Sequence, residues 1–163
     1  MSVIYLASAS PRRQELIRYL GINPKIVVSN FDEASLAHIK DPIVYVEAAA
    51  TGKAAAVADQ YQGIVIGVDT DVVCPDGHIL GKPENTDAAI AMLKQLSGRT
   101  HSVHSAIVLV DSTVEPHRVS SEITTTRVTF ADIPEDQLKA YVATGSPFDK
   151  AGGYGMQDQA MAF

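Results

Sequence analysis

Two polar segments of this sequence follow apolar runs and carry residue types suited to phosphate chemistry. The first, Ser8 to Arg13, contains two serines and two adjacent arginines directly after the apolar run Val3 to Ala7. Pro11 suits the first turn of a helix capped by Ser10. A helix N-terminus with hydroxyls and guanidinium groups beside it can bind phosphate. A capped helix with two solvated arginines is the simpler local interpretation, and the glycines of a P-loop are missing from the segment.

The second polar segment, Asp69-Thr70-Asp71, follows the apolar run Ile64 to Val68. This run is the clearest predicted strand, and we expect it to deliver the three polar residues at its C-terminal end. Carboxylates there can hold a metal ion or accept a proton from water. Aspartate and threonine also cap turns frequently, and the residues alone favour neither interpretation.

Other charged residues add to these two segments. Glu33 follows a predicted strand at Lys25 to Val28, and Lys53 lies on the apolar-spaced side of an alanine-rich predicted helix. Lys82 lies in a Gly-Lys-Pro turn, where an ordinary exposed lysine is equally expected. Taken together, these groups supply carboxylates for a metal and cations for phosphate oxygens. Hydrolysis of a phosphoanhydride needs both.

The remaining metal-ligand types do not form a convincing set. His101 and His104 are three residues apart on a predicted strand and should face opposite sides of it. We expect packing or surface roles for both. Cys74 is the only cysteine, which excludes an internal disulfide and fits a reducing compartment.

The elements that position these residues alternate between strands and helices. Predicted helices begin after Ser10, at Asp41-Pro42, at Asn85 or Thr86 and at Pro134, and a hairpin turn is predicted at Asp76-Gly77. Further strands are predicted at 103–110 and 118–130, and the stretch 146–163 is loop-like. The pattern predicts one α/β or mixed α+β domain over residues 1–163, in which polar residues at strand ends face a ligand crevice.

Bulk composition excludes several functional classes. The net charge of −6 argues against a nucleic-acid binder, which usually carries a basic face. The sequence contains neither an apolar run of membrane-spanning length nor a signal-peptide pattern at its N-terminus. We therefore expect a cytoplasmic protein that does not bind membranes.

Four blocks of the sequence resemble the Maf family of nucleoside triphosphate pyrophosphatases. They are Leu6-Ala7-Ser8-Ala9-Ser10-Pro11-Arg12-Arg13-Gln14-Glu15-Leu16; Ile66-Gly67-Val68-Asp69-Thr70 with Ile79-Leu80-Gly81-Lys82-Pro83; Met92-Leu93 with Leu96-Ser97-Gly98-Arg99-Thr100-His101; and Asp149-Lys150-Ala151-Gly152-Gly153-Tyr154-Gly155-Met156-Gln157. The blocks occur in the family's order from about residue 3 to the C-terminus.

The resemblance implies an elongated fold similar to that of inosine triphosphatases, with a nucleotide cleft between two lobes, and often a homodimer. It implies hydrolysis of a nucleoside triphosphate to the monophosphate and pyrophosphate, assisted by a divalent metal such as Mg²⁺ or Mn²⁺. In the family the aspartate matching Asp69 is the proton acceptor, and we also assign it, with Glu33, to the metal. The residues that line the phosphate and metal site match Ser8, Arg13, Glu33, Lys53 and Lys82.

Three residues resemble the branch of the family that acts on dTTP and UTP: Arg12, Thr70 and Gln157. A glutamine can present both a donor and an acceptor to a pyrimidine edge, and modified pyrimidine nucleotides are further candidate substrates. One alternative is a 7-methyl-GTP pyrophosphatase. Another is a non-catalytic nucleotide-binding regulator of cell division.

The sequence departs from the family's pattern at three places. The segment from Asp69 to Lys82 is longer than in the family, and Asp158 stands where a glycine normally follows the glutamine. A glycine there permits backbone conformations that an aspartate disfavours, so the geometry beside Gln157 is in question. We also expect the single domain, which ends here at Phe163, to lack the family's C-terminal strand and helix.

Overall fold

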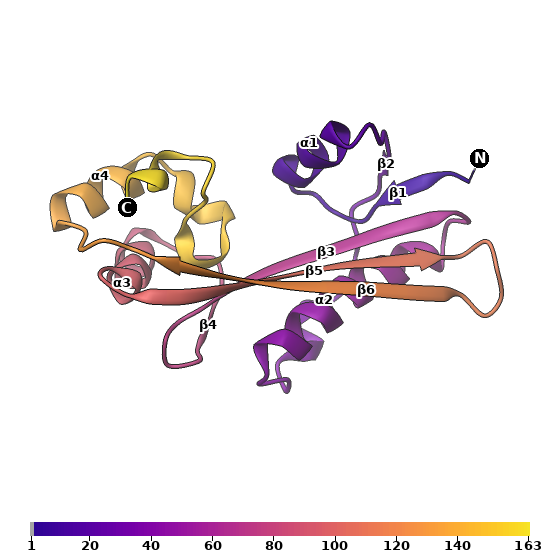
Figure 1. Ribbon diagram of the computed structural model, residues 1–163, viewed down its shortest axis with the longest axis horizontal. Coiled ribbons are helices and arrows are strands. Elements are labelled where there is room, and N and C mark those ends of the chain that lie inside the picture. Colours follow the sequence, from indigo (N-terminus) through magenta and orange to yellow (C-terminus); the bar gives the residue numbers. More distant parts are fainter. Residues whose placement is uncertain (1) are drawn as a thin grey trace. The chain divides into compact units, whose positions relative to one another are not determined.

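The computed structural model describes residues 2–163 and shows a mixed α/β protein, as the sequence predicts (Figure 1). The strands are β1 (Ile4–Leu6), β2 (Lys25–Ile26), β3 (Ile64–Val73), β4 (Ile79–Leu80), β5 (Thr100–Asp111) and β6 (Arg118–Thr129). The α-helices are α1 (Pro11–Tyr19), α2 (Pro42–Ala58), α3 (Thr86–Leu96) and α4 (Glu135–Ala143). Short 3₁₀ helices are η1 (Glu33–Leu36), η2 (Ser146–Asp149), η3 (Ala151–Gly153) and η4 (Gln159–Ala162). The order in the sheet is β2-β1-β3-β5-β6, and β4 pairs with β3.

The chain divides into two compact units, each with its own buried core. The first comprises the chain up to Asp69 together with Ser105–Thr124, and the second comprises Thr70–His104 and Thr125–Phe163. None of the helices in residues 2–163 has the length and hydropathy of a membrane-spanning segment.

In the first unit, α2 packs on the parallel strands β1 and β3. Leu6 of β1 lies opposite Ile66 of β3, and the core joins Val65 to Ala50 and Ala54 of α2. The helix starts where the sequence predicts, because the carboxylate of Asp41 accepts hydrogen bonds from the first-turn N–H groups. The small alanine side chains let the helix approach the strands closely.

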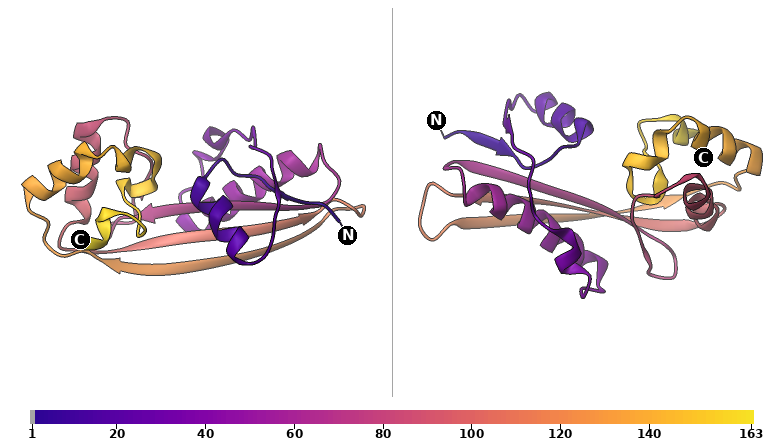
Figure 2. Two further views of the ribbon diagram at one scale, coloured as in Figure 1. Left: turned by 90° about the horizontal axis from the view of Figure 1, so that it is seen from above. Right: turned by 180° about the vertical axis from the view of Figure 1, so that it is seen from behind.

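The second unit is built around α3 and α4. Asn85 caps α3 as predicted, and its side chain accepts a hydrogen bond from Ala88 N. The predicted hairpin is also present, since Val73 of β3 pairs with Ile79 of β4. In both views of Figure 2 the yellow C-terminal segment lies with α3 and α4. This stretch, predicted to be loop-like, contains η2, η3 and η4.

The prediction that a strand ends at Val68 is wrong, because β3 continues to Val73. Asp69 and Asp71 therefore lie within a strand, and both are buried. The apolar run stops at Val68, but ladder hydrogen bonds depend on the backbone and on the neighbouring strands rather than on side-chain polarity. Pairing of β3 with β4 supports its second half. The strand that does end beside Asp69 is β1, whose last partner on β3 is Ile66.

Candidate functional site

The structure brings Glu33, Lys53 and Asp69 together in the first unit. Nζ of Lys53 lies 2.5 Å from Oδ1 of Asp69 and 3.1 Å from Oε1 of Glu33. The side chains of Lys53 and Asp69 are only 15% and 9% exposed, whereas that of Glu33 is 49% exposed. The charged cluster is therefore enclosed by protein at Asp69 and open to solvent at Glu33.

A close approach of α2 to β3 joins Lys53 to Asp69. Side chains alternate along a strand, so Val65, Gly67 and Asp69 share one face of β3, and all three are buried. A Cβ atom at Gly67 would lie 2.2 Å from the carbonyl oxygen of Ala50 and 2.8 Å from Cβ of Ala54. Only glycine allows this spacing, and Lys53 lies on the turn of α2 between these two alanines.

A second glycine brings Glu33 to the same lysine. A Cβ atom at Gly52 would lie 2.4 Å from the ring of Phe31, so this ring packs directly on α2 beside Lys53. Asp32 then begins η1 by accepting a hydrogen bond from Ala34 N, which holds Glu33 in the first turn. The roles of Gly52 and Gly67 are not among the features predicted from the sequence. Their signal was available, since an isolated glycine inside a helix or a strand pattern indicates close backbone approach.

Arg13 is tied to β3 beside the cluster. Ala7 N donates to Ile66 O at 2.8 Å, after which β1 turns away into α1. The next carbonyl of β3 on that edge belongs to Val68, and Nη1 of Arg13 donates to it at 2.9 Å. The guanidinium thus takes over an acceptor that a longer β1 would have used. The simpler interpretation of Arg13 as a solvated side chain is therefore wrong, because its guanidinium is bound to the backbone of β3.

The loop before α1 differs from the prediction in one detail. Ser10 occupies the N-cap position, but its side chain makes no hydrogen bond to the first turn. Instead, Oγ of Ser8 accepts a hydrogen bond from Ser10 N at 3.2 Å. Ser8 is buried, and Arg12 is half-buried on the first turn of the helix. The Ser8 hydroxyl therefore holds the loop while its proton stays available for donation to another acceptor.

The remaining predicted site residues, Thr70, Lys82 and Gln157, belong to the second unit. Thr70 follows Asp69 in β3 and is half-buried on the opposite face of that strand. Lys82 and Gln157 are exposed. The roles of these three residues stay predictions.

The two histidines pack inside the protein. His101 and His104 are 2% and 8% exposed. Nε2 of His101 lies 2.6 Å from the hydroxyl of Tyr154, and Nδ1 of His104 lies 2.8 Å from the hydroxyl of Thr125. Burial lowers the pKa of His101, which favours its neutral form. The expected packing roles are confirmed.

Glu33 and Asp69 are two carboxylates that could contribute to holding a metal ion, because both lie at the same ammonium group. Within residues 2–163, His, Cys, Asp and Glu side chains form no group of three or more that could hold one. Mg²⁺ in nucleotide enzymes usually takes one or two carboxylates, and phosphate oxygens and water complete its shell. These two carboxylates already share one cation, the ammonium of Lys53. The pair therefore suits Mg²⁺ or Mn²⁺ that arrives with a triphosphate.

Comparisons with known proteins identify the family of this chain. The family described as "Maf-like protein" matches residues 3–163. A "dTTP/UTP pyrophosphatase" of Moorella thermoacetica is 48% identical over 96% of this chain and 79% of its own. One of Clostridium novyi is 43% identical over 94% of this chain and 80% of its own. A solved nucleoside-triphosphatase / dITP/XTP pyrophosphatase from Mycobacterium abscessus is a distant likeness, with a TM-score of 0.49 and 19% identity over 80% of this chain and 75% of that one. The family match and the two close sequence relatives show that this chain belongs to the Maf family.

Proposed function

We propose that this protein hydrolyses nucleoside triphosphates, with dTTP and UTP preferred, to the monophosphate and pyrophosphate. The observation that carries the proposal is the cluster of Glu33, Lys53 and Asp69, with Arg13 anchored beside it. It combines carboxylates for a metal and a proton with cations for phosphate oxygens. Relatives named dTTP/UTP pyrophosphatase at 43% and 48% identity support the choice of nucleotide.

In the proposed mechanism Asp69 orients a water molecule and accepts its proton as the oxygen attacks the α-phosphorus in line. Pyrophosphate leaves from the opposite side. Oxygens of the triphosphate compete with Asp69 for the ammonium of Lys53, and this competition frees the carboxylate to act as the base. A divalent metal held by Glu33 and Asp69 would supply neutralisation of the phosphate charge.

Three further groups would stabilise charge on the phosphates. Arg13 and Lys82 offer N–H donors to phosphate oxygens, and the guanidinium of Arg13 is already oriented by its bond to Val68. Ser8 can donate its hydroxyl proton, because its oxygen is the acceptor in the bond from Ser10 N. Donors fixed before the reaction cost no reorganisation when charge develops in the transition state.

Replacing Lys53 by Met should increase the affinity of the nucleotide-free protein for Mn²⁺. The ammonium that the two carboxylates share competes with a divalent ion for the same oxygens. We expect a gain of about 10–100-fold, as judged from charge interactions at this range. Titration with Mn²⁺, followed by electron paramagnetic resonance, measures it without turnover.

The matched control for this metal titration is Lys40→Met, which removes an exposed lysine of the same unit whose ammonium donates to the backbone carbonyl of Ala37. Its Mn²⁺ affinity should equal that of the wild type. In the double variant Lys53→Met with Glu33→Gln, the gain should disappear. Equal Mn²⁺ binding by the wild type and Lys53→Met would show that Glu33 and Asp69 are not the metal pair.

The nucleotide preference is tested by pyrophosphate release from dTTP, UTP, ATP, GTP and 7-methyl-GTP, with and without Mg²⁺ or Mn²⁺. We expect kcat/KM for dTTP and UTP to exceed the others by about tenfold or more, because a site that hydrogen-bonds a base edge penalises a base that leaves its groups unpaired. Gln157→Ala should lower the ratio of kcat/KM for dTTP or UTP to kcat/KM for the other nucleotides. This effect should be larger than the effect on kcat for dTTP or UTP. A preference for 7-methyl-GTP would contradict the branch assignment. Nucleotide binding without any pyrophosphate release would favour the regulator.

A further inference from the structure

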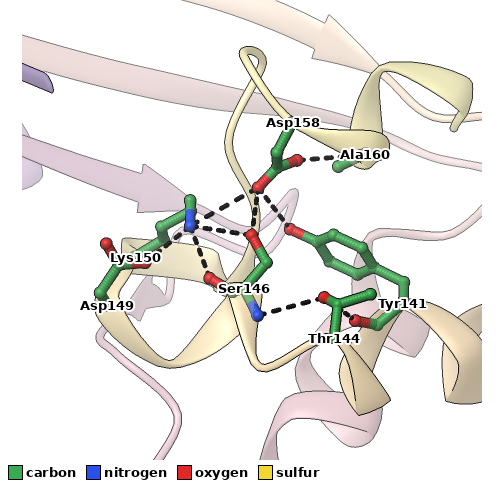
Figure 3. Close-up of polar contacts among 7 residues, drawn as sticks. All are labelled: Tyr141, Thr144, Ser146, Asp149, Lys150, Asp158 and Ala160. Atoms are coloured by element: carbon green, nitrogen blue, oxygen red, sulfur yellow. Dashed lines mark hydrogen bonds and ion pairs between the residues drawn. The ribbon is translucent and has the colours of Figure 1, made fainter.

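Asp158, which stands where the resemblance leads us to expect a glycine, is the centre of a partly buried polar cluster in the second unit (Figure 3). Its Oδ2 accepts hydrogen bonds from the hydroxyl of Ser146 at 2.6 Å and from that of Tyr141 at 3.0 Å. Its Oδ1 accepts from Ala160 N at 2.9 Å. Nζ of Lys150 lies 3.5 Å from Oδ2. One carboxylate thus contacts residues of α4, η2 and η4, and also Lys150, which lies between η2 and η3.

Lys150 precedes the segment 151–157, and its ammonium contacts Asp158 at the other end of that segment. Its side chain is only 9% exposed, and Nζ donates to the carbonyl oxygen of Ser146 at 2.5 Å, to its hydroxyl at 3.0 Å and to Asp149 at 2.6 Å. A Cβ atom at Gly155 would lie 2.9 Å from Cε of Lys150, so the lysine stem runs directly against the loop backbone. The loop 151–157 is therefore bounded by two side chains that form an ion pair.

The surroundings favour an ionised Asp158 and a protonated Tyr141. Burial favours the neutral form of Asp158, but hydrogen bonds from Ser146, Ala160 and Tyr141 and the charge of Lys150 outweigh it and lower the pKa. Burial, with a contribution from Asp158, raises the pKa of Tyr141, so this hydroxyl stays a donor. The carboxylate is thus ionised at neutral pH, and both of its oxygens accept hydrogen bonds.

The backbone at Asp158 is unstrained, with φ −120° and ψ −165°, an extended conformation that any residue adopts. Asp158 therefore occupies the position after Gln157 without needing the conformational freedom of a glycine. Asp158 N also donates to Gly155 O at 3.2 Å. Gln157 itself is exposed, and the residue that follows it is held by both its backbone and its side chain.

We propose that Asp158 is a positioning residue that fixes the backbone at Gln157 and so sets the selectivity among nucleotides. This inference rests on the role of Gln157 in the proposed function. Loss of the Asp158 side chain should weaken recognition of the preferred base without impairing the hydrolytic step.

A double-mutant cycle between Asp158 and Gln157 tests this inference. Asp158→Ala should raise KM for the preferred nucleotide by about tenfold with little change in kcat, and should narrow the kcat/KM ratio between preferred and disfavoured nucleotides. In an Asp158→Ala, Gln157→Ala double variant the ratio should equal that of Gln157→Ala alone, since residues that act through one another are not additive. Hydrogen exchange of the amides in 151–157 should be about tenfold faster in Asp158→Ala.

If Asp158→Ala fails to fold, two milder variants test the same role of Asp158. Asp158→Asn retains one acceptor oxygen but loses the charge that faces Lys150, and Tyr141→Phe keeps the buried ring but removes one donor. Both should shift selectivity in the same direction by a smaller factor. Glu135→Gln is the control, because its exposed carboxylate pairs with Lys94 and Lys139, away from Asp158. It should leave the kinetics unchanged.

Additive effects of Asp158→Ala and Gln157→Ala would overturn the inference, and so would an unchanged ratio in folded Asp158→Asn and Tyr141→Phe. An equal loss of kcat for every nucleotide would likewise mark Asp158 as merely structural. If the wild type prefers a purine nucleotide, the proposed function is wrong. The same cycle, run on whichever nucleotide the wild type prefers, still decides the role of Asp158.

Discussion

Replacing Asp69 by Asn should lower kcat for pyrophosphate release by about 10²–10⁴-fold while the protein stays folded. The amide keeps the size of the carboxylate but cannot accept a proton from water. It also removes one negative charge facing Lys53, which lies 2.5 Å from Oδ1. Single-turnover measurements with dTTP and saturating Mg²⁺ separate the loss in the chemical step from changes in binding.

The control for Asp69 is Asp59→Asn, which makes the same chemical change at the exposed C-terminal end of α2 in the same unit. We expect its kcat to match that of the wild type. Thermal unfolding shows whether Asp69→Asn retains the fold. Near-normal kcat in folded Asp69→Asn would contradict the assignment of Asp69 as the base. Its contact with Lys53 would then be the role that the structure supports.

The second large effect is expected for Gly67→Ala, which adds a single methyl group between β3 and α2. The new Cβ atom would lie 2.2 Å from a backbone oxygen, so the helix itself must move. Overpacking of this kind costs about 1–3 kcal/mol, or roughly 2–12 °C in Tm for a chain of this size. Because α2 carries Lys53, the displacement should also lower kcat/KM, and a shift of about 1 Å can cost up to ~10²-fold.

Gly81→Ala is the matched control for stability. A Cβ atom there meets no other atom within 4 Å, and its backbone is not left-handed. Its Tm should stay within about 1–2 °C of the wild type, as for surface substitutions in general. If Gly67→Ala retained both the wild-type Tm and the wild-type kcat/KM, the close approach of α2 to β3 would not be needed for the site.

Features decided by neighbouring residues could be predicted from the sequence. Asp41 and Asn85 begin helices, because each side chain accepts a hydrogen bond from an N–H group two or three residues ahead. The turn at Asp76-Gly77 closes the β3–β4 hairpin for an equally local reason. The Maf blocks likewise marked the family, which the match over residues 3–163 confirms.

The candidate site required the tertiary structure, because its groups come from segments far apart in the chain. The sequence indicated that Glu33, Lys53 and Asp69 carry suitable charges, but their contacts depend on how closely α2 lies against β3. Gly67 permits that distance because it has no side chain, and Gly52 permits Phe31, two residues before Glu33, to pack on α2 for the same reason. The sequence likewise marked Asp158 only as a departure from the family. Its partners Tyr141, Ser146 and Lys150 are brought to it by packing, and partial burial strengthens the contacts that one carboxylate makes with all three.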